Sequence, residues 1–259
     1  MSKTVSKIVP LNKDEIKKMV LVCKLAARSL ENIAKYVKPG ISTNDIDKIV
    51  YDHTLSLGCE PACLGYHGYP KTVCTSVNSI ICHGLPDDNT VLKEGDIINV
   101  DITHRKDGFF GDCSATFLVG QVSEKAKAIT QAALEARDIG IEIVAPGVTT
   151  GDIGFAVDKY VTRKGYSTVK EIGGHGIGRK FHEEPFVPSY GKRGRGDILV
   201  PWQCITVEPM VNEGSASIKE FDIGNSSIKY YETSDGKLSA QFEHTLLVTD
   251  KGYEILTLP

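Results

Sequence analysis

The chain is 259 residues long, which is enough to bury a large core as one domain or as two fused halves. Its composition, with 41% hydrophobic and 24% charged residues, is typical of a globular protein. A formal net charge of −3 gives no general reason to expect DNA, another nucleic acid or an acidic membrane as partner.

Targeting and redox signals point to the cytoplasm. No apolar run approaches the ~18 residues that a transmembrane helix needs. The first ten residues, MSKTVSKIVP, lack the apolar core of a signal peptide. The seven cysteines form an odd set without paired C-x2-C spacing, so we expect reduced thiols, most of them in the core. We therefore expect a cytoplasmic protein that does not contact a membrane.

Four helices are predicted from apolar periodicity and from capping residues. In the first, apolar residues recur every three or four positions after Asn12, where Glu15 completes a capping box, and Pro39-Gly40 ends the helix. The other three begin after hydroxyl residues: after Ser42 or Thr43, ending at Gly58; after Ser123, along 126–143; and after Thr149 or Thr150, ending at Gly165.

Strands are predicted where β-branched and aromatic residues gather. Five such segments are 72–76, 97–103, 114–119, 204–207 and 245–248. Because no low-complexity linker divides the chain, we expect its two halves to share one sheet system. The Gly- and Arg-rich stretch GKRGRGD, residues 191–197, is the most obvious exposed loop.

A repeat at a fixed offset of 107 residues is the most informative feature of the sequence. Residues 37–58 align without a gap with residues 144–165, and 8 of the 22 positions are identical. The same offset aligns LKEGDIINVD, which ends in Asp101, with LVPWQCITVE, which ends in Glu208. The repeat predicts two pseudo-symmetric halves that bring acids to one shared place, where only a cation makes so much negative charge tolerable.

A hairpin turn at Asp107-Gly108 predicts how the acids of the first half are arranged. If these two residues form the turn, Thr103 pairs with Asp112. Asp101 then lies two residues away on the same face, so the Cβ atoms of the two acids are ~7–8 Å or somewhat less apart. Both carboxylates could reach one ion pair. The alternative is two solvated strand acids.

The second half repeats this pattern of acids. Glu208 ends the strand CITVE before Pro209, and Glu243 precedes the apolar strand HTLLV much as Asp112 precedes SATFLV. Each half thus offers one acid at a strand end and one at the start of a following strand. One or two hard cations with oxygen ligands would explain two such pairs better than surface charge does.

Three histidines lie in settings that suit a reactive site. His175 stands in GGHGIG, where flanking glycines let the backbone approach closely, His182 stands in KFHEEP, and His83 stands in ICHGLP. The spacing of His175 and His182 does not match a helical metal pair. One histidine as a metal ligand, with the others as proton or oxyanion partners, is the simplest interpretation, although each alone is more often structural.

Several segments together carry a family resemblance. They are CLGYHGYPKTVCTSVNSIICHGLPDD, GDIINVDITHRKDGFFGDCSATFLVG, GGHGIGRKFHEEPFV, TVEPMV and LSAQFEHTLLVTD. With the matching helices they run from about residue 10 to the C-terminus, and the chain resembles the type I methionine aminopeptidases of the short bacterial kind. The resemblance implies an α+β pita-bread fold, with two pseudo-symmetric halves around a curved antiparallel sheet and helices outside. It implies a short extension at 1–10 and one catalytic domain at 11–259, with pseudo-repeats at about 11–120 and 121–259.

The resemblance also assigns site residues. The implied ligands of two divalent metal ions are Asp101, Asp112, His175, Glu208 and Glu243. The implied catalytic residues are His83, His182 and Glu208, of which the two histidines also contact substrate. The implied lining of the methionine side-chain pocket is Cys63, Tyr66, Tyr69, Cys74 and Phe181. Asn78 and Ser239 match positions near an additional monovalent cation.

The implied activity is removal of the N-terminal methionine from nascent proteins and peptides when the second residue is small, a step in protein maturation. The metals could be Mn, Fe, Co or Zn, because a carboxylate-rich site with one histidine accepts all four. The implied partners are N-termini of nascent polypeptides. We expect a monomer, and the loop 191–197 could contact the ribosome, although a solvated loop is the commoner role of such a stretch.

Two alternatives share the fold: another peptidase, such as an X-Pro aminopeptidase or prolidase, or a non-enzymatic binding module. Filled positions for all five ligands argue against the binding module. The sequence departs from the family pattern at Trp202, at Ile172-Gly173, and at 221–236, which looks longer than usual. These departures predict a changed pocket rim, where Tyr230 or Tyr231 takes the place of the family's lid tryptophan.

Overall fold

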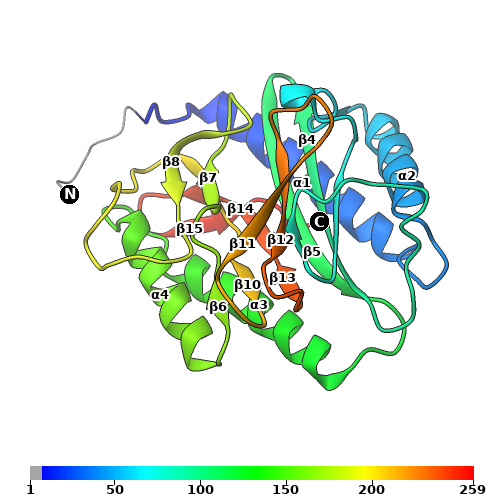
Figure 1. Cartoon of the computed structure of the whole chain (residues 1–259). Coiled ribbons are helices and arrows are strands. Elements are labelled where there is room, and N and C mark those ends of the chain that lie inside the picture. Colours follow the sequence, from blue (N-terminus) through cyan, green and yellow to red (C-terminus); the bar gives the residue numbers. More distant parts are fainter. Residues whose placement is uncertain (1–7) are drawn as a thin grey trace.

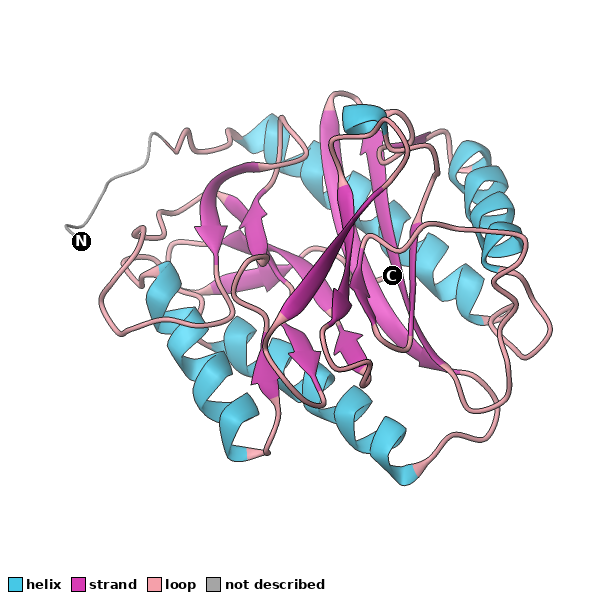
Figure 2. Cartoon of the chain, in the orientation of Figure 1, coloured by secondary structure: helices cyan, strands magenta, loops and turns pink. Residues whose placement is uncertain are grey.

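The computed structural model describes residues 8–259 and shows helices on the outside of a curved antiparallel sheet (Figures 1 and 2). The four α-helices are α1 (Lys13–Ala34), α2 (Thr43–Ser56), α3 (Glu124–Glu142) and α4 (Thr150–Arg163). A 3-10 turn, η1 (Tyr66–Gly68), lies in the long connection after α2. The molecule is therefore of the α+β class.

The main sheet joins strands from both halves of the chain. Its path runs through β1 (Glu60–Pro61), β4 (Ile97–Lys106), β5 (Phe109–Leu118), β14 (Glu243–Val248), β9 (Cys204–Val207), β7 (Gly174–Gly176) and β8 (Glu183–Val187). Off this path, β2 (Cys74–Val77) pairs with β4 and β15 (Tyr253–Ile255) pairs with β14. Because β5 pairs with β14, the two halves share one sheet system, as predicted.

Two small sheets complete the fold. One contains β13 (Ser239–Gln241), β10 (Met210–Asn212) and β6 (Ser167–Thr168). The other contains β11 (Ile218–Asp222), β12 (Lys229–Thr233) and β3 (Ile80–Cys82). Figure 1 shows the β11–β12 hairpin, in orange, in front of the main sheet, whereas α1 runs behind it. The hairpin and the helices thus lie on opposite sides of the sheet.

The hydrophobic core fills the space between helices and sheet. On α1, Met19 and Val22 are fully buried and belong to one cluster with Leu247 of β14. Ile129 of α3 and Val157 of α4 are fully buried in a second cluster. Burying a side chain of this size contributes ~1.5–3 kcal/mol. The helices therefore hold one face of the sheet, and the polar residues of the site occupy the other.

The repeat seen in the sequence is also a repeat of hydrogen bonds. Helix α2 is capped by Ser42 with Asp45, and helix α4 by Thr149 with Asp152, in matching capping boxes. Isolated bridges join Ser42 to Val91 and Thr149 to Ile198, so both members of each bridge differ by the offset of 107. The division into a 1–10 extension and pseudo-repeats at 11–120 and 121–259 stays a prediction, and residues 1–7 lie outside the described part.

The register of the β4–β5 hairpin is the predicted one. Asp107 and Gly108 form the turn, both with positive φ, and Thr103 pairs with Asp112 while Asp101 pairs with Ser114. Other limits differ from prediction. Helix α1 ends at Ala34, ahead of Pro39-Gly40.

Strand β2 begins later than the predicted 72–76, at Cys74. The reason is local, because the backbone N–H groups of Thr72 and Val73 donate to the Asp47 carboxylate of α2 at 2.7 and 3.3 Å instead of joining a ladder. The remaining helices begin after the predicted caps Ser42, Ser123 and Thr149.

Candidate metal centre and peptide pocket

Pairing in the main sheet brings the predicted acids together. Asp101 of β4 lies opposite Ser114 of β5, and Ser114 in turn lies opposite Glu243 of β14. Asp112 is two residues from Ser114 and so projects from the same face. Glu208 follows β9 directly, on the other side of β14. Strand alternation thus directs four carboxyl groups, two from each half, into one place.

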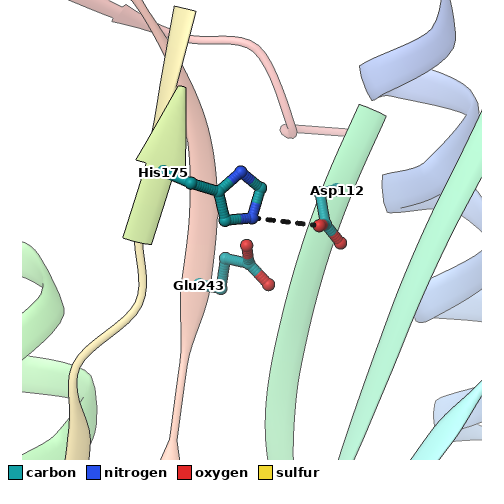
Figure 3. A group of neighbouring side chains, drawn as sticks. All are labelled: Asp112, His175 and Glu243. Atoms are coloured by element: carbon teal, nitrogen blue, oxygen red, sulfur yellow. Dashed lines mark ion pairs between the residues drawn. The ribbon is translucent and has the colours of Figure 1, made fainter. Parts of the chain in front are cut away.

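His175 reaches the same place from β7. Its Nδ1–H donates to the carbonyl of Gly176 at 2.9 Å, which leaves the lone pair of Nε2 facing the acids. Nε2 lies 3.9 Å from Asp112 Oδ2 and 3.6 Å from Glu208 Oε1. Figure 3 shows the His175 ring and the Asp112 and Glu243 carboxylates turned toward one another.

Burial disfavours charge on this cluster. Burial raises the pKa of Asp101 to about 6 and that of Glu208 to about 8. Burial, and then the neighbouring carboxylates, raise the pKa values of Asp112 and Glu243 well above their ordinary range. Burial also lowers the pKa of His175 to about 4, so its ring is neutral at pH 7. A positive charge at the centre would reverse the penalty on the four carboxylates.

The donor set fits a divalent cation. One ligand atom each from Asp112, His175 and Glu243 lies within 4.8 Å of the others. Asp101 Oδ1 and Glu243 Oε1 are buried without a hydrogen-bond partner, which is costly unless something else binds them. Four carboxyls and one neutral imidazole are ligands that first-row divalent metals prefer. The residues present therefore fit the metal use predicted for them.

Three further polar residues, not predicted from the sequence, hold the carboxylates in place. Thr103 donates to Asp112 Oδ1 at 2.8 Å. Thr206 donates to Glu208 Oε1 at 2.7 Å, and the Gln241 side-chain amide donates to Glu208 Oε2 at 3.0 Å. Thr103 is two residues after Asp101 and Thr206 is two before Glu208, so strand alternation was the signal that could have found them.

A cavity of about 350 Å³ opens beside the cluster. Its lining includes all twelve residues predicted for catalysis, metal and side-chain binding. On one side, Cys63, Tyr69, Cys74 and Phe181 are buried and form an apolar slot together with Tyr66. All seven cysteines are free and buried, as expected. The structure thus places the predicted methionine pocket directly next to the predicted ligands.

Backbone and hydroxyl partners orient the other two histidines. Burial lowers the pKa of both His83 and His182, the latter to about 3, so both rings are neutral at pH 7. His83 Nδ1–H donates to the carbonyl of Lys229 at 2.9 Å, which makes Nε2 an acceptor. His182 Nδ1 lies 2.9 Å from the Tyr66 hydroxyl; when that hydroxyl donates, Nε2 carries the proton.

The pocket rim differs in part from the prediction. Ile172 and Gly173 line the cavity as expected, but Trp202 does not. Its φ is 66°, and its carbonyl accepts a hydrogen bond from the N–H of Leu11. In the long segment 221–236 the lining residue is Ile228.

Neither predicted tyrosine of that segment lines the cavity. Tyr230 packs against the slot from outside, and the ring of Tyr231 lies 6.1 Å from that of His83. The strand explains why the prediction was wrong, because Tyr230 and Tyr231 are paired into the β11–β12 hairpin while Ile228 precedes β12 and is free to turn inward. The sequence carried no signal for this choice.

The predicted monovalent-cation residues are neighbours but lie outside this cavity. The N–H of Ser239 donates to the carbonyl of Asn78 at 2.8 Å. The Asn78 side chain accepts from the N–H of Ile97 and donates to Asp96. A cation there stays a prediction. Among the described residues, no helix is long and apolar enough to cross a membrane.

Known proteins resemble this chain over nearly its whole length. The model of metallopeptidase family M24 matches residues 17–250. The methionine aminopeptidase of Escherichia coli (strain K12) is 46% identical over 246 residues, which are 95% of this chain and 92% of that protein. The crystal structure of methionine aminopeptidase from Rickettsia prowazekii gives a TM-score of 0.93 at 41% identity and covers 97% of this chain and 100% of its own.

A more distant likeness shows the fold alone. The prolidase from Pyrococcus horikoshii gives a TM-score of 0.77 at 21% identity, covering 96% of this chain but only 63% of the prolidase. Together these likenesses confirm the pita-bread fold. The chain belongs to metallopeptidase family M24, which uses divalent metal, and within that family to the methionine aminopeptidases.

Proposed function

We propose that this protein removes the N-terminal methionine from polypeptides whose second residue is small. The observation that carries the proposal is one continuous cavity in which a slot lined by thiol and aromatic groups ends at a cluster of buried carboxyls. A flexible thioether suits such a soft apolar slot. The carboxyl cluster suits hydrolysis of a peptide bond. Because the cluster lies at the end of the slot, the bond that is cleaved is the one after the residue whose side chain fills the slot.

The proposed metal holders are the four carboxyls and one imidazole, namely Asp101, Asp112, His175, Glu208 and Glu243. Two divalent ions bound there would polarise the scissile carbonyl and lower the pKa of a water molecule. Mn, Fe, Co and Zn all suit this donor set. The partnerless oxygens of Asp101 and Glu243 support the proposal, because an ion would satisfy both.

A free amino terminus is the proposed feature that makes the enzyme an exopeptidase. Among the described residues that line the cavity, the charged side chains are acidic and no lysine or arginine is present. An amine is therefore favoured at the end of the slot, whereas the uncharged amide of an internal residue gains nothing there. The slot and the amine site together select the first residue of a chain.

His182, His83 and Glu208 have separate proposed roles. With the Tyr66 hydroxyl donating to Nδ1, His182 presents Nε2–H to the oxygen that becomes negative in the transition state. His83 presents the lone pair of Nε2, because its Nδ1–H is held by Lys229, and can accept from the N–H of the second residue. The Glu208 carboxylate accepts a proton from the attacking water and passes it to the leaving nitrogen.

The small second residue follows from crowding. The second residue passes His83, which lines the cavity and is held in place by the carbonyl of Lys229. A large side chain there would clash or leave polar groups unpaired. We infer that nascent N-termini in the cytoplasm are the natural substrates and that the protein acts as a monomer.

Contact of loop 191–197 with the ribosome stays a prediction. Arg193 lies over the Phe155 ring at 4.8 Å, so part of the basic charge of this loop is engaged within the molecule. Co-sedimentation with ribosomes, compared between the wild type and Lys192→Ala, would test it.

The test is cleavage of tripeptides with metal content measured in parallel. We expect Met-Ala-Ser to be cleaved, acetyl-Met-Ala-Ser and Leu-Ala-Ser to resist, and Met-Lys-Ser to be at least ~100-fold slower. A chelator should abolish cleavage and Mn²⁺ should restore it, with two ions bound per chain. Equal rates for Met-Ala-Ser and Met-Lys-Ser, or a preference for proline at the second position, would instead indicate a different pita-bread peptidase.

A further inference from the structure

One aromatic side chain at the mouth of the cavity has no role in the proposed chemistry. Phe186 of β8 is 43% exposed, although it lines the same cavity as the metal ligands. In the β7–β8 pair it lies directly opposite His175. Directly paired residues project from the same face with Cβ atoms ~4.5–5.5 Å apart. The ring therefore stands beside the metal centre and is still open to solvent.

A glycine makes room for this ring. A Cβ atom at Gly173 would lie 3.2 Å from Phe186 Cζ, 3.3 Å from Cε2 and 2.9 Å from the carbonyl oxygen of Val187. No other residue type fits there without moving the strand or the ring. Ile172, next to Gly173, lines the cavity too. Phe186, Gly173 and Ile172 together form an apolar surface at the rim, which we call the rim platform.

We propose that the rim platform binds the side chain of the third residue of the substrate and favours large apolar or aromatic groups. This inference rests on the proposed function, because it takes the methionine slot as the position of the first residue. An extended peptide advances ~3.3–3.6 Å per residue, so the third residue lies about 7 Å beyond the methionine carbonyl. Phe186, paired directly with His175, stands one strand spacing from the acid cluster and so lies within this range.

The chemistry of the platform selects apolar groups over small ones. An exposed ring gains when a second apolar surface removes it from water, and aromatic pairs gain further from edge and offset contacts. Glu171 and Glu184 line the same cavity. Charge at the third residue would add a second effect, so the decisive comparison uses peptides whose third side chain is uncharged.

The test is the ratio of kcat/KM for Met-Ala-Phe to that for Met-Ala-Gly, both with amidated C-termini. For the metal-loaded wild type we expect a ratio of about 5 to 20. Phe186→Ser should bring the ratio close to one, and Phe186→Leu, which keeps an apolar side chain, should retain most of it. Tyr253→Ser removes another exposed aromatic, from β15 and outside the cavity, and should leave the ratio at the wild-type value.

The outcomes separate this inference from the proposed function. Cleavage of Met-Ala-Gly with no preference for Met-Ala-Phe in the wild type would overturn the platform and leave the methionine aminopeptidase activity standing. A preference that survives Phe186→Ser would also overturn it. Failure to cleave either peptide would overturn the proposed function and the platform together. If Phe186→Ser does not fold, the wild-type ratio and that of Phe186→Leu still decide, since a leucine that abolishes the preference contradicts an apolar contact.

Discussion

The two halves of the molecule supply their acids in different ways. In the N-terminal half, Asp101 and Asp112 stand on one hairpin whose two strands are joined by a two-residue turn. In the C-terminal half, Glu208 and Glu243 flank two paired strands, β9 and β14, that are separated in sequence by four other strands. The positions of the acids are repeated, whereas the length of chain between them is not.

The additional chain in the second half forms part of the cavity wall. The β11–β12 hairpin lies between Glu208 and Glu243 in sequence, and the segment that leads into β12 places Ile228 in the cavity wall. The carbonyl of Lys229 sets the orientation of His83, which comes from the other half. The repeated parts therefore carry the four acids proposed as metal ligands, and the unrepeated part lines the cavity beside them.

Replacing one acid in each half tests whether the halves contribute equally. Asp112→Asn and Glu243→Gln keep side-chain shape but remove a negative charge, and neutral amides bind hard cations poorly. We expect each variant, like Asp101→Asn, to lose roughly 10³-fold or more in kcat with metal supplied in excess. Asp107→Asn on the turn of the same hairpin is the matched control, because asparagine also tolerates positive φ.

Kinetics with saturating Mn²⁺, together with metal analysis, give the answer. Near-normal turnover by Asp112→Asn would remove the dinuclear assignment. A large loss of kcat in the variants of one half only would contradict an equal contribution of the two halves.

Replacing His175 and His182 one at a time distinguishes the proposed role of metal ligand from that of transition-state stabilisation. His175→Ala should lower metal affinity, since it removes the imidazole that faces Asp112 and Glu208. His182→Ala should retain metal but lose about 10²–10⁴-fold in kcat, since only stabilisation of the transition state is lost. Metal titration by calorimetry and steady-state kinetics on Met-Ala-Ser distinguish the two. Identical metal binding by both variants would refute this division of roles.

Much of the site was predictable because strand geometry is periodic. The turn at Asp107-Gly108 sets the register of β4 and β5, and that register alone places Asp101 and Asp112 on one face. The repeat offset then located Glu208 from Asp101. Caps at Ser42 and Thr149 were predictable for the same reason, because a capping box is a local pattern.

Other parts depend on contacts between distant segments and left no local signal. The carbonyl of Lys229 meets His83 across 146 residues of sequence, and no pattern in either segment announces it. Ile228 was missed in favour of Tyr230 or Tyr231 because the residue type pointed to an aromatic lid, whereas the hairpin pairing decides which side chains turn inward. Trp202 was expected at the rim of the cavity. The lining is instead formed by residues of other segments, among them Ile172, Gly173 and Ile228.

Tyr66 of the slot contacts His182 through its hydroxyl and provides a smaller test. Tyr66→Phe keeps the ring, whose centroid lies 4.8 Å from that of Phe181, but removes the hydroxyl at His182 Nδ1. The proton of His182 can then move to Nδ1, so we expect kcat to fall about tenfold while KM for Met-Ala-Ser changes little. Tyr69→Phe is a poor control, because its hydroxyl donates within the buried core, so Tyr51→Phe on the exposed side of α2 serves instead. A change in KM alone would mean that Tyr66 only shapes the slot.

The smallest expected effect is on the free energy of unfolding of the metal-free protein. It tests whether the two acid pairs of the two halves form a site for a cation. Burial raises the pKa of Glu208 to about 8, so at pH 7 the folded state holds a proton that the unfolded chain has released. Burial shifts the pKa values of Asp112 and Glu243 in the same direction. Stability therefore falls as pH rises from 7 to 8, by up to ~1.4 kcal/mol for Glu208. The buried histidines have lowered pKa values and change charge only below about pH 6.5, outside this window.

Thermal unfolding at pH 7 and pH 8 measures this difference. With chelator present, we expect Tm to fall by about 2–4 °C for each kcal/mol lost. With Mn²⁺ bound, the ions take the place of the protons and the fall should nearly vanish, because the carboxylates are then charged in both states. Glu208→Gln removes one titrating group and should reduce the slope of the metal-free protein. A metal-free Tm that is equal at both pH values would show that the carboxyl cluster is solvated rather than held for a cation.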